Sequence, residues 1–493
     1  MRKALIIGSG FSGLSTACFL AKAGYKVEVL EKNEGPGGRC RVWESEGFRF
    51  DMGPSWYWMP DVFERFFQQF GKKPGDYFTL KRLDPSYRVF FDQETWDIPA
   101  GTEALGQLLE KYERGAAEKL NLFLKEAKYK YETGMKNLVY KPGLHLSEFI
   151  DLDVVKGLFR LDLLKSMSQH IRKYFHHPKI IQLLEFPVLF LGAKPSETPA
   201  LYSLMNYADI ELGTWYPEGG MFRIVEGMYA LAQDLGVAFR FGTEVQKVHS
   251  EGKQIKKVQT NQGMMDADIV ISGADYHHME SKILEPSKRN YSEKYWESRT
   301  MAPSSLLFYL GLNKKVDGLL HHNLFFDADF DQHASDIYDT AKWPEDPLFY
   351  VSCTSKSDST VAPEGMENLF VLIPLAPGLE DSEEMREKFY RVVMKRLESQ
   401  LKQSLRDHVI LKRSYAMKDF VNDYHSFKGN AYGLANTLRQ TAILKPSLKN
   451  KKLDNLYYTG QLTVPGPGVP PSLISGEVVS KEIIHHHPIY SYE

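Results

Sequence analysis

The sequence predicts an α/β protein, in which a domain with a parallel sheet is joined to a mixed, antiparallel-rich β-sheet domain and a helical region. Three observations support this fold class. An apolar run at residues 5–7 is followed at once by a glycine-rich turn and a helix-like segment. Further runs of buried-strand character stand at 267–274 and 454–460. Strand-like segments at 87–99 and 305–376 indicate a second sheet.

The first element is a strand–turn–helix unit built around three glycines with G-x-G-x-x-G spacing. Gly8 allows a tight turn, Gly10 lets the backbone approach a pyrophosphate, and Gly13 lets the helix and strand pack closely. The helix N-terminus then points free N–H groups at the phosphates. A second strand ends in Glu31, at about the 20-residue offset where an acid holds ribose hydroxyls. The unit therefore predicts dinucleotide binding, with an ordinary βαβ turn as the alternative.

A second glycine-rich loop follows the acid and indicates which dinucleotide binds. Residues 32–41 contain Gly37, Gly38 and Arg39, and Arg39 can neutralise a pyrophosphate with its planar donor fork. Together with residues 47–55, this loop resembles the flavoprotein superfamily of amine oxidases, carotenoid desaturases and Rab escort proteins, whose FAD lies in an extended groove. The resemblance predicts a Rossmann-like FAD-binding domain. A surface turn is the alternative interpretation of the loop.

Composition excludes several classes of protein. Among 493 residues, 61 Lys and Arg against 63 Asp and Glu give a formal charge of −2, which argues against nucleic acid as a partner. Cys18, Cys40 and Cys353 are odd in number and far apart, so we expect no disulfide framework, no metal site and a reducing compartment. The N-terminal apolar run is too short for a signal peptide. The sequence contains no uninterrupted apolar stretch of about 18 residues, so we expect no membrane-spanning helix.

The chain alternates between the domains. We expect the first part of the FAD-binding domain at 1–75, substrate-domain strands at 76–103, a helical region facing a tunnel or the membrane at 104–221, the second part of the FAD-binding domain at 222–298, the substrate-domain sheet and helix at 299–444, and the C-terminal part of the FAD-binding domain at 445–493.

Local signals place single elements within these segments. Asp61 has the character of an N-cap before a helix, and the aromatic cluster at 55–60 suits either the core or a wall of the flavin site. Residues 87–91 and 96–99 predict paired strands, and 103–185 predicts amphipathic helices. Near the C-terminus, Pro470 and Pro471 suit the first turn of a helix. Its N-terminus would stabilise the negative charge of a reduced flavin, unless the helix merely caps the sheet.

Several motifs resemble the bacterial-type phytoene desaturase family. They are residues 50–55, the block from 189 to 220, and the C-terminal segment in which residues 455–458 precede Gly460 and a Pro-Gly-x-Gly-Val-like run. Gln461, Leu462 and Val464 depart from the family pattern. The resemblance implies FAD-dependent removal of hydrogen from adjacent carbons of a linear C40 polyene, with Val245 of a Thr-Glu-Val segment against the adenine.

The motifs and the resemblance together predict a set of cofactor-binding residues. They are Gly8, Gly10, Phe11, Ser12, Gly13, Glu31, Lys32, Gly38, Arg39, Gly53, Pro54, Ser55, Val245, Gly460, Gly468, Val469 and Pro470. No catalytic residue is assigned, because the cofactor carries the difficult step. The histidine pairs at 277–278 and 321–322 and the tail at 485–487 lack ligand partners at suitable spacing, so we interpret them as solvated histidines.

Other functions share parts of this pattern. A C30 diapophytoene desaturase, a hydroxycarotenoid 3,4-desaturase and a carotenoid isomerase are alternatives within the family. An amine oxidase or a prenyl-protein escort is more remote. The electron acceptor is open, with quinone or oxygen both suitable. Since a polyene partitions into bilayers, we expect a cytoplasmic protein attached to the inner face of the cell membrane through the apolar segment 180–191, unless that segment lines the tunnel.

Overall fold

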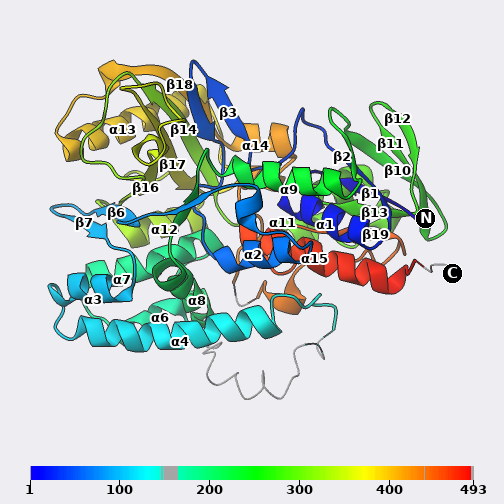
Figure 1. Cartoon of the computed structure of the whole chain (residues 1–493), viewed down its shortest axis with the longest axis horizontal. Coiled ribbons are helices and arrows are strands. Elements are labelled where there is room, and N and C mark those ends of the chain that lie inside the picture. Colours follow the sequence, from blue (N-terminus) through cyan, green and yellow to red (C-terminus); the bar gives the residue numbers. More distant parts are fainter. Residues whose placement is uncertain (1, 146–147, 149–164, 438, 490–493) are drawn as a thin grey trace.

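The structure, a computed structural model, describes residues 2–145, 148, 165–437 and 439–489. Figure 1 shows two sheet regions and a helical region. A parallel sheet with α1, α9 and α15 lies on the side where both termini are found. A larger sheet with α13 lies at the other end. Helices α3, α4, α6 and α7 lie below that larger sheet in the view.

The parallel sheet is built from five strands of the described chain in the order β19-β13-β1-β2-β9. All its neighbouring strands run parallel, and the four apolar residues that follow Lys3 in β1 are buried. Buried parallel strands are expected where helices cover both faces. The strands are β1 (Lys3–Ile7), β2 (Lys26–Leu30), β9 (Ala238–Arg240), β13 (Ile269–Ser272) and β19 (Leu456–Tyr458).

The second sheet has seven strands among the described residues, in the order β18-β14-β17-β16-β15-β6-β7. Only the β15–β6 pair is parallel; the other pairs are antiparallel. The strands are β6 (Tyr87–Phe90), β7 (Thr95–Ile98), β14 (Ser304–Leu312), β15 (His322–Phe325), β16 (Phe349–Ser352), β17 (Glu367–Leu375) and β18 (Val409–Tyr415). The prediction that the early strands and those after residue 300 form one mixed sheet is confirmed.

Three smaller sheets complete the strands. They comprise β3 (Val42–Ser45) with β4 (Phe48–Asp51), β5 (Leu80–Arg82) with β8 (Trp215–Pro217), and β10 (Val245–Glu251), β11 (Gln254–Thr260) and β12 (Gly263–Asp266). Strand β8 lies in the region predicted to be helical, and the glycine-rich turn expected there follows it. Its pairing with β5 comes from a partner about 130 residues away, so no local sequence signal could indicate it.

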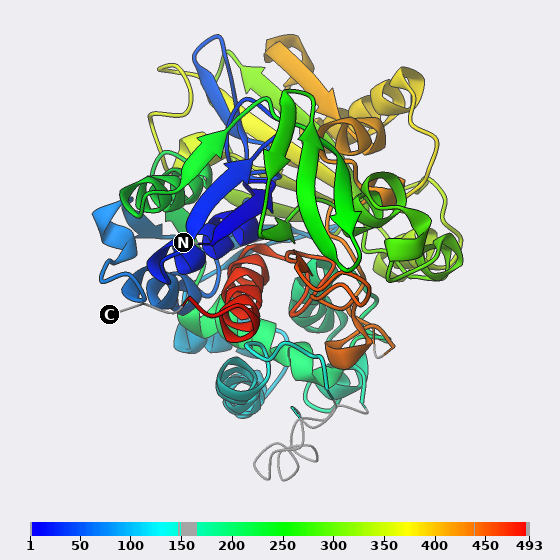
Figure 2. The same ribbon diagram turned by 90° about the vertical axis from the view of Figure 1, so that its right-hand side faces the viewer.

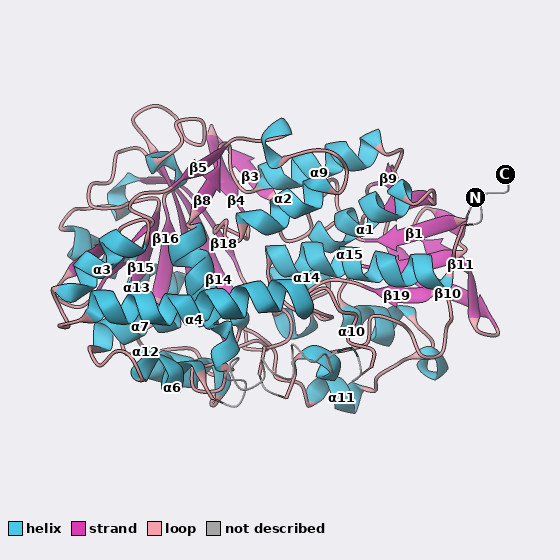
Figure 3. Cartoon of the chain, turned by 60° about the horizontal axis from the view of Figure 1, so that its bottom comes forward, coloured by secondary structure: helices cyan, strands magenta, loops and turns pink. Residues whose placement is uncertain are grey.

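The helices divide between the two sheets and the helical region (Figure 3). They are α1 (Phe11–Lys22), α2 (Pro60–Gln68), α3 (Thr102–Glu110), α4 (Ala116–Asn137), α6 (Met167–Arg172), α7 (Pro178–Glu185), α8 (Leu204–Tyr207), α9 (Phe222–Asp234), α10 (Tyr276–His278), α11 (Glu293–Glu297), α12 (Phe330–Tyr338), α13 (Glu383–Leu401), α14 (Met417–Tyr424) and α15 (Val469–His486). In the described part of the chain, no helix combines the length and hydropathy needed to cross a bilayer.

Helix α2 begins two residues earlier than predicted. Pro60 occupies the first helical position, which suits a residue without an N–H. The N-cap is Met59, so the prediction of Asp61 as the cap was wrong. The Asp61 carboxylate instead accepts a hydrogen bond of 2.7 Å from the Tyr131 hydroxyl of α4. This bond ties the helical region to the FAD-binding half.

The segment predicted to face lipid is buried. Ile180, Leu183 and Phe186 are at most 2% exposed and belong to the hydrophobic core. They lie on α7 and on the 3₁₀ segment after it, and the flanking Arg172 and Lys179 form ion pairs with carboxylates. The prediction of segment 180–191 as an exposed anchor was therefore wrong for residues 180–188, whose burial the structure describes, because packing of apolar side chains against the protein core satisfies the same sequence pattern.

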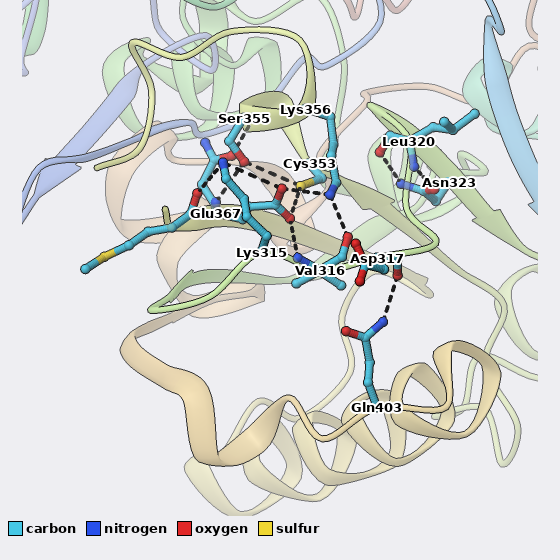
Figure 4. A network of polar contacts seen from close by, with 12 residues as sticks. Lys315, Val316, Asp317, Leu320, Asn323, Cys353, Ser355, Lys356, Glu367 and Gln403 are labelled. Atoms are coloured by element: carbon cyan, nitrogen blue, oxygen red, sulfur yellow. Dashed lines mark hydrogen bonds and ion pairs between the residues drawn. The ribbon is translucent and has the colours of Figure 1, made fainter. Parts of the chain in front are cut away.

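A polar network surrounds Glu367, the first residue of β17 in the seven-stranded sheet (Figure 4). The Glu367 carboxylate is 1% exposed and lies 2.7 Å from Lys356 Nζ. It also accepts a hydrogen bond of 3.0 Å from the Val316 backbone N–H and one of 3.5 Å from the Cys353 thiol. Burial, reinforced by the Glu367 charge, raises the pKa of Cys353 to about 12. Cys353 is therefore an inert core thiol, and the predicted absence of a disulfide is confirmed for it and for Cys18 and Cys40.

Candidate functional site

A cavity of about 390 Å³ lies between the parallel sheet and the seven-stranded sheet. Its walls include 16 of the 17 residues predicted to bind the cofactor. These are Gly8, Gly10, Phe11, Ser12, Glu31, Lys32, Gly38, Arg39, Gly53, Pro54, Ser55, Val245, Gly460, Gly468, Val469 and Pro470. Folding thus brings segments from four distant parts of the chain to one site.

The two glycine loops lie side by side in the wall of this cavity, where the Gly37 backbone N–H donates a hydrogen bond of 2.9 Å to the Ser9 carbonyl. Gly8 turns the chain at the end of β1 with φ of +94°, which favours glycine. Gly10 is the N-cap of α1, and a Cβ added to Gly38 would lie 3.2 Å from Gly10 Cα. Both loops therefore expose bare backbone at the N-terminus of α1, where the N–H groups of the first turn have no partner within the helix. This arrangement suits a bound pyrophosphate.

Gly13 does not line the cavity and acts in packing. A Cβ at this position would lie 2.1 Å from the Gly8 carbonyl oxygen, a separation that no side chain tolerates. Glycine is therefore required where α1 crosses β1. This is the role predicted for the third glycine of the motif.

The Glu31 carboxylate is held in position at the end of β2. Its Oε2 accepts hydrogen bonds from the Ser9 backbone N–H at 2.9 Å and the Ser9 hydroxyl at 2.8 Å. Its Oε1 accepts hydrogen bonds from the backbone and side-chain N–H groups of Asn33, both at 2.9 Å. Because Glu31 is 4% exposed and lines the cavity, its oriented oxygens can accept bonds from a diol that replaces the side-chain donors.

Arg39 is a partly buried cation beside the same cavity. Its Nη2 donates a hydrogen bond of 2.6 Å to the Ser426 hydroxyl, and its guanidinium lies 5.1 Å from the centroid of the Tyr424 ring. Its Nε has no hydrogen-bond partner among the described residues. Burial lowers the pKa of Arg39, and the Asp275 carboxylate opposes that shift. A partly buried arginine with an unused donor fits an anionic ligand.

Helix α15 brings a second helix N-terminus to the cavity. Gly468 is its N-cap with φ of +112°, and Pro470 and Pro471 occupy its first turn, as predicted. The helix lies against α1, as Figure 2 shows. The Ser15 hydroxyl donates a hydrogen bond of 2.8 Å to the Leu473 carbonyl, and a Cβ at Gly476 would lie 2.5 Å from Ser15 Cβ. Close packing thus directs both helix N-termini at one ligand.

The remainder of the cavity wall is largely apolar and aromatic. It is formed by Trp56, Trp58, Met59, Met205, Leu307, Tyr350, Phe370, Leu372, Phe420 and Tyr432. Most come from the seven-stranded sheet or from the aromatic cluster at 55–60. That cluster serves both predicted uses, since Trp56 and Trp58 line the cavity while Tyr57 stacks on Phe63 in the core.

Sequence reasoning missed several residues of the site. Asp275 follows the buried strand β13, and the rule that ligands bind at the carboxyl ends of parallel strands could have found it. Tyr424 and His425 come from α14 and its C-cap, and they carry no local signal. Tyr432 lies in the small-residue loop at 430–437, for which the sequence suggests no function.

The interpretation of the histidine pairs as solvated was wrong for His321 and His322. They are 4% and 0% exposed, because β15 lies in the middle of the second sheet. Burial lowers the pKa of His321 to about 3 and that of His278 likewise to about 3. In the tail, His485 and His486 are exposed. No group of three metal-ligating side chains occurs among the described residues.

The residues present fit FAD. The adjacent glycine loops, the helix N-termini of α1 and α15, and the partly buried Arg39 would hold the pyrophosphate and the flavin. Glu31 would hold the adenosine ribose, with Val245 at the mouth of the same groove. When bound, FAD supplies hydride acceptance. The chain supplies orientation and a chamber whose lining is largely apolar.

Comparisons with known proteins agree with this geometry. Residues 11–484 match the family described as flavin containing amine oxidoreductase. The chain is 44% identical to a carotenoid 3,4-desaturase of Haloarcula japonica, over 97% of each chain. It is 31% identical to a zeta-carotene-forming phytoene desaturase of Myxococcus xanthus, over 98% of this chain and 94% of the relative.

A solved structure supports the fold. An oxidoreductase from Methanosarcina mazei superimposes with a TM-score of 0.63 at 16% identity, over 97% of this chain and 100% of that one. The sequence similarity and the shared fold both extend over 97% of this chain, so the relationship is not confined to the cofactor site. The chain belongs to the carotenoid desaturases of the flavin containing amine oxidoreductase family, and it is an FAD-dependent oxidoreductase that acts on CH–CH bonds.

Proposed function

We propose that this protein desaturates a linear C40 carotenoid, with the C3–C4 bond near the end of the polyene as the first candidate position. The observation that carries the proposal is the continuity of one cavity, which joins the glycine-loop cradle to the apolar chamber. A hydrocarbon offers no polar handle, so its orientation depends on such a chamber. The 44% identity to a carotenoid 3,4-desaturase favours this position.

Phytoene is the second candidate substrate. It is the substrate predicted from the sequence motifs, and the relative from Myxococcus xanthus supports it with 31% identity along nearly the whole chain. The two candidates differ in which bond lies beside the flavin, since phytoene lacks the long conjugated system of a 3,4-desaturase substrate. The aromatic wall accepts either polyene.

The experiment compares three substrates with one preparation of FAD-loaded protein. Phytoene, lycopene and a 1-hydroxycarotenoid are supplied in phosphatidylcholine liposomes, and products are measured by mass and absorption. Loss of two hydrogens from lycopene or the hydroxycarotenoid, with phytoene unchanged, is the expected result. Conversion of phytoene alone favours the second candidate. If flavin-loaded protein converts none of the three, the proposal is wrong.

Association with the cytoplasmic face of the cell membrane is part of the proposal, because the substrate partitions into lipid. The buried residues 180–188 do not serve this purpose. Helix α4 instead exposes Leu122 and Tyr129, which are 52% and 37% exposed and seven residues apart on one face. Lys125 and Lys128 are exposed between them. Lys128 also lies 3.7 Å from the Glu132 carboxylate. The exposed apolar side chains and the neighbouring lysines suit an interface with anionic lipid.

Liposome flotation tests this surface. A Leu122→Glu, Tyr129→Glu double variant is expected to lose flotation with anionic vesicles while it retains flavin. Ile410→Glu is the control, because Ile410 is 46% exposed on the second sheet. Equal flotation of both variants and the wild type contradicts a role for α4, and failure of the wild type to float contradicts membrane association.

A further inference from the structure

A polar pair interrupts the apolar wall of the chamber. Tyr350 of β16 pairs with Leu372 of β17 on one side and with Leu324 of β15 on the other. Of these three residues only Tyr350 carries a polar side chain, and it lines the cavity. His322 stands two residues before Leu324 on β15, so it points to the same face of the sheet.

The two side chains are joined directly. Tyr350 Oη and His322 Nδ1 lie 2.6 Å apart in a hydrogen bond. The imidazole stacks on the Trp56 ring, with centroids 4.1 Å apart and planes inclined by 13°. Trp56 lines the cavity and follows Ser55 of the predicted flavin-binding segment. Tyr350 and Trp56 therefore lie in the part of the chamber wall that adjoins the predicted flavin site, and His322 contacts both of them from behind that wall.

This arrangement is unfavourable for folding alone. His322 is fully buried, and its Nε2 has no hydrogen-bond partner among the described residues. An unpaired buried ring nitrogen opposes folding, whereas two phenylalanines would fill the same space without that cost. Departures of this kind from the best-folding sequence are expected at functional positions.

We propose that Tyr350 and His322 together accept the proton that desaturation removes from the carotenoid. The inference rests on the proposed function. Forming one double bond removes a hydride and a proton from neighbouring carbons, and FAD, when bound, would supply the acceptor for the hydride. The second C–H bond breaks, and its electron pair becomes the new π bond. Its proton passes to Tyr350 Oη as the phenolic proton moves to His322 Nδ1. When product leaves, the extra proton passes from the Tyr350–His322 pair through the cavity to the solvent.

The environment keeps the pair ready for this step. Burial, together with the neighbouring His321, lowers the pKa of His322 well below its ordinary value, so the imidazole is neutral before reaction. Burial raises the pKa of the Tyr350 phenol, against the effect of the Ser352 and Ser55 hydroxyls. The phenol therefore keeps its proton for the bond to His322. A weak base is sufficient, because the carbocation left by hydride loss is a strong acid.

The test uses FAD-loaded protein without oxygen, in a single turnover with lycopene or phytoene in phosphatidylcholine liposomes. Tyr350→Phe, His322→Phe and the double variant keep aromatic rings in place. Tyr309→Phe is the matched control. Tyr309 is fully buried on β14 and donates a hydrogen bond of 3.0 Å to the Met52 carbonyl, but it does not line the cavity. Flavin content, product, geometric isomers of recovered substrate and the midpoint of thermal unfolding are measured.

Each single variant is expected to lower the desaturation rate by about 100-fold or more, in the range of general base catalysis. The double variant loses no more, since the residues act as one unit. Recovered substrate becomes isomerised, because the carbocation regains its hydride when the proton has no acceptor. The midpoint of unfolding stays or rises. Tyr309→Phe is expected to lower the midpoint and keep the rate within twofold.

Three results overturn the inference. One is desaturation within threefold of wild type in either single variant. Another is additive losses in the double variant. The last is a loss of rate that merely follows loss of flavin or of thermal stability. A wild-type protein that converts neither carotenoid contradicts the proposed function instead, and the two failures are thus distinguished.

Discussion

Substitution of Gly10 separates cofactor binding from folding. The backbone of Gly10 has φ of −69°, which any residue adopts, and the nearest atom to an added Cβ is Gly38 Cα at 4.0 Å. The fold without cofactor therefore accepts alanine, and valine with little adjustment. The added carbon atoms would lie in the cavity wall at the N-terminus of α1, where we place the pyrophosphate.

The expected loss of affinity follows from the displaced phosphate. Two charge-assisted hydrogen bonds to the N-terminus of α1 contribute about 1.5–3 kcal/mol each. Their loss in Gly10→Val totals about 3–6 kcal/mol, which weakens FAD binding by about 100-fold to 10,000-fold. Gly10→Ala is expected to give a smaller loss of the same sign.

Titration of apoprotein with FAD, followed by quenching of flavin fluorescence, measures the affinity. The unfolding midpoint of the apoprotein measures the fold. Gly13→Ala is the matched control, because its Cβ would lie 2.1 Å from the Gly8 carbonyl oxygen and must displace backbone. It is expected to lower the midpoint. If Gly10→Val protein binds FAD as tightly as wild type, or unfolds as early as Gly13→Ala protein, the placement of the pyrophosphate is refuted.

Three further predictions concern stability. Lys356→Met strands the buried Glu367 carboxylate and is expected to cost about 3–5 kcal/mol in urea unfolding, whereas Lys315→Met, at 3.9 Å from that carboxylate and more exposed, costs little. Burial lowers the pKa of His333 to about 4. As the pH is lowered, the unfolded state therefore binds a proton at His333 before the folded state does. The free energy of unfolding falls by about 3 kcal/mol between pH 6.5 and pH 4. In urea unfolding at a series of pH values, a His333→Gln variant is expected to lack this part of the pH dependence. Gly476→Val clashes with α1 and is expected to lower the unfolding midpoint, and an unchanged midpoint contradicts the close helix packing.

The sequence alone determined the elements whose signals are local. The G-x-G-x-x-G turn, the acid at the end of the second strand and the prolines at the start of α15 each act within a few residues, so their roles follow from backbone geometry. The family resemblance then indicated the cofactor and the class of reaction, which the comparisons confirm. The division of strands between two sheets also followed from their order and patterning.

Tertiary structure alone decided the burial of individual side chains and the composition of the chamber. Residues 180–188 and the 321–322 pair have compositions that suit either a surface or an interior, and only packing against distant segments places them inside. Tyr350 and His322 are 28 residues apart and meet because β15 and β16 pair in one register. Such contacts depend on long-range pairing and on the shape of the whole core, which local propensity and periodicity do not encode.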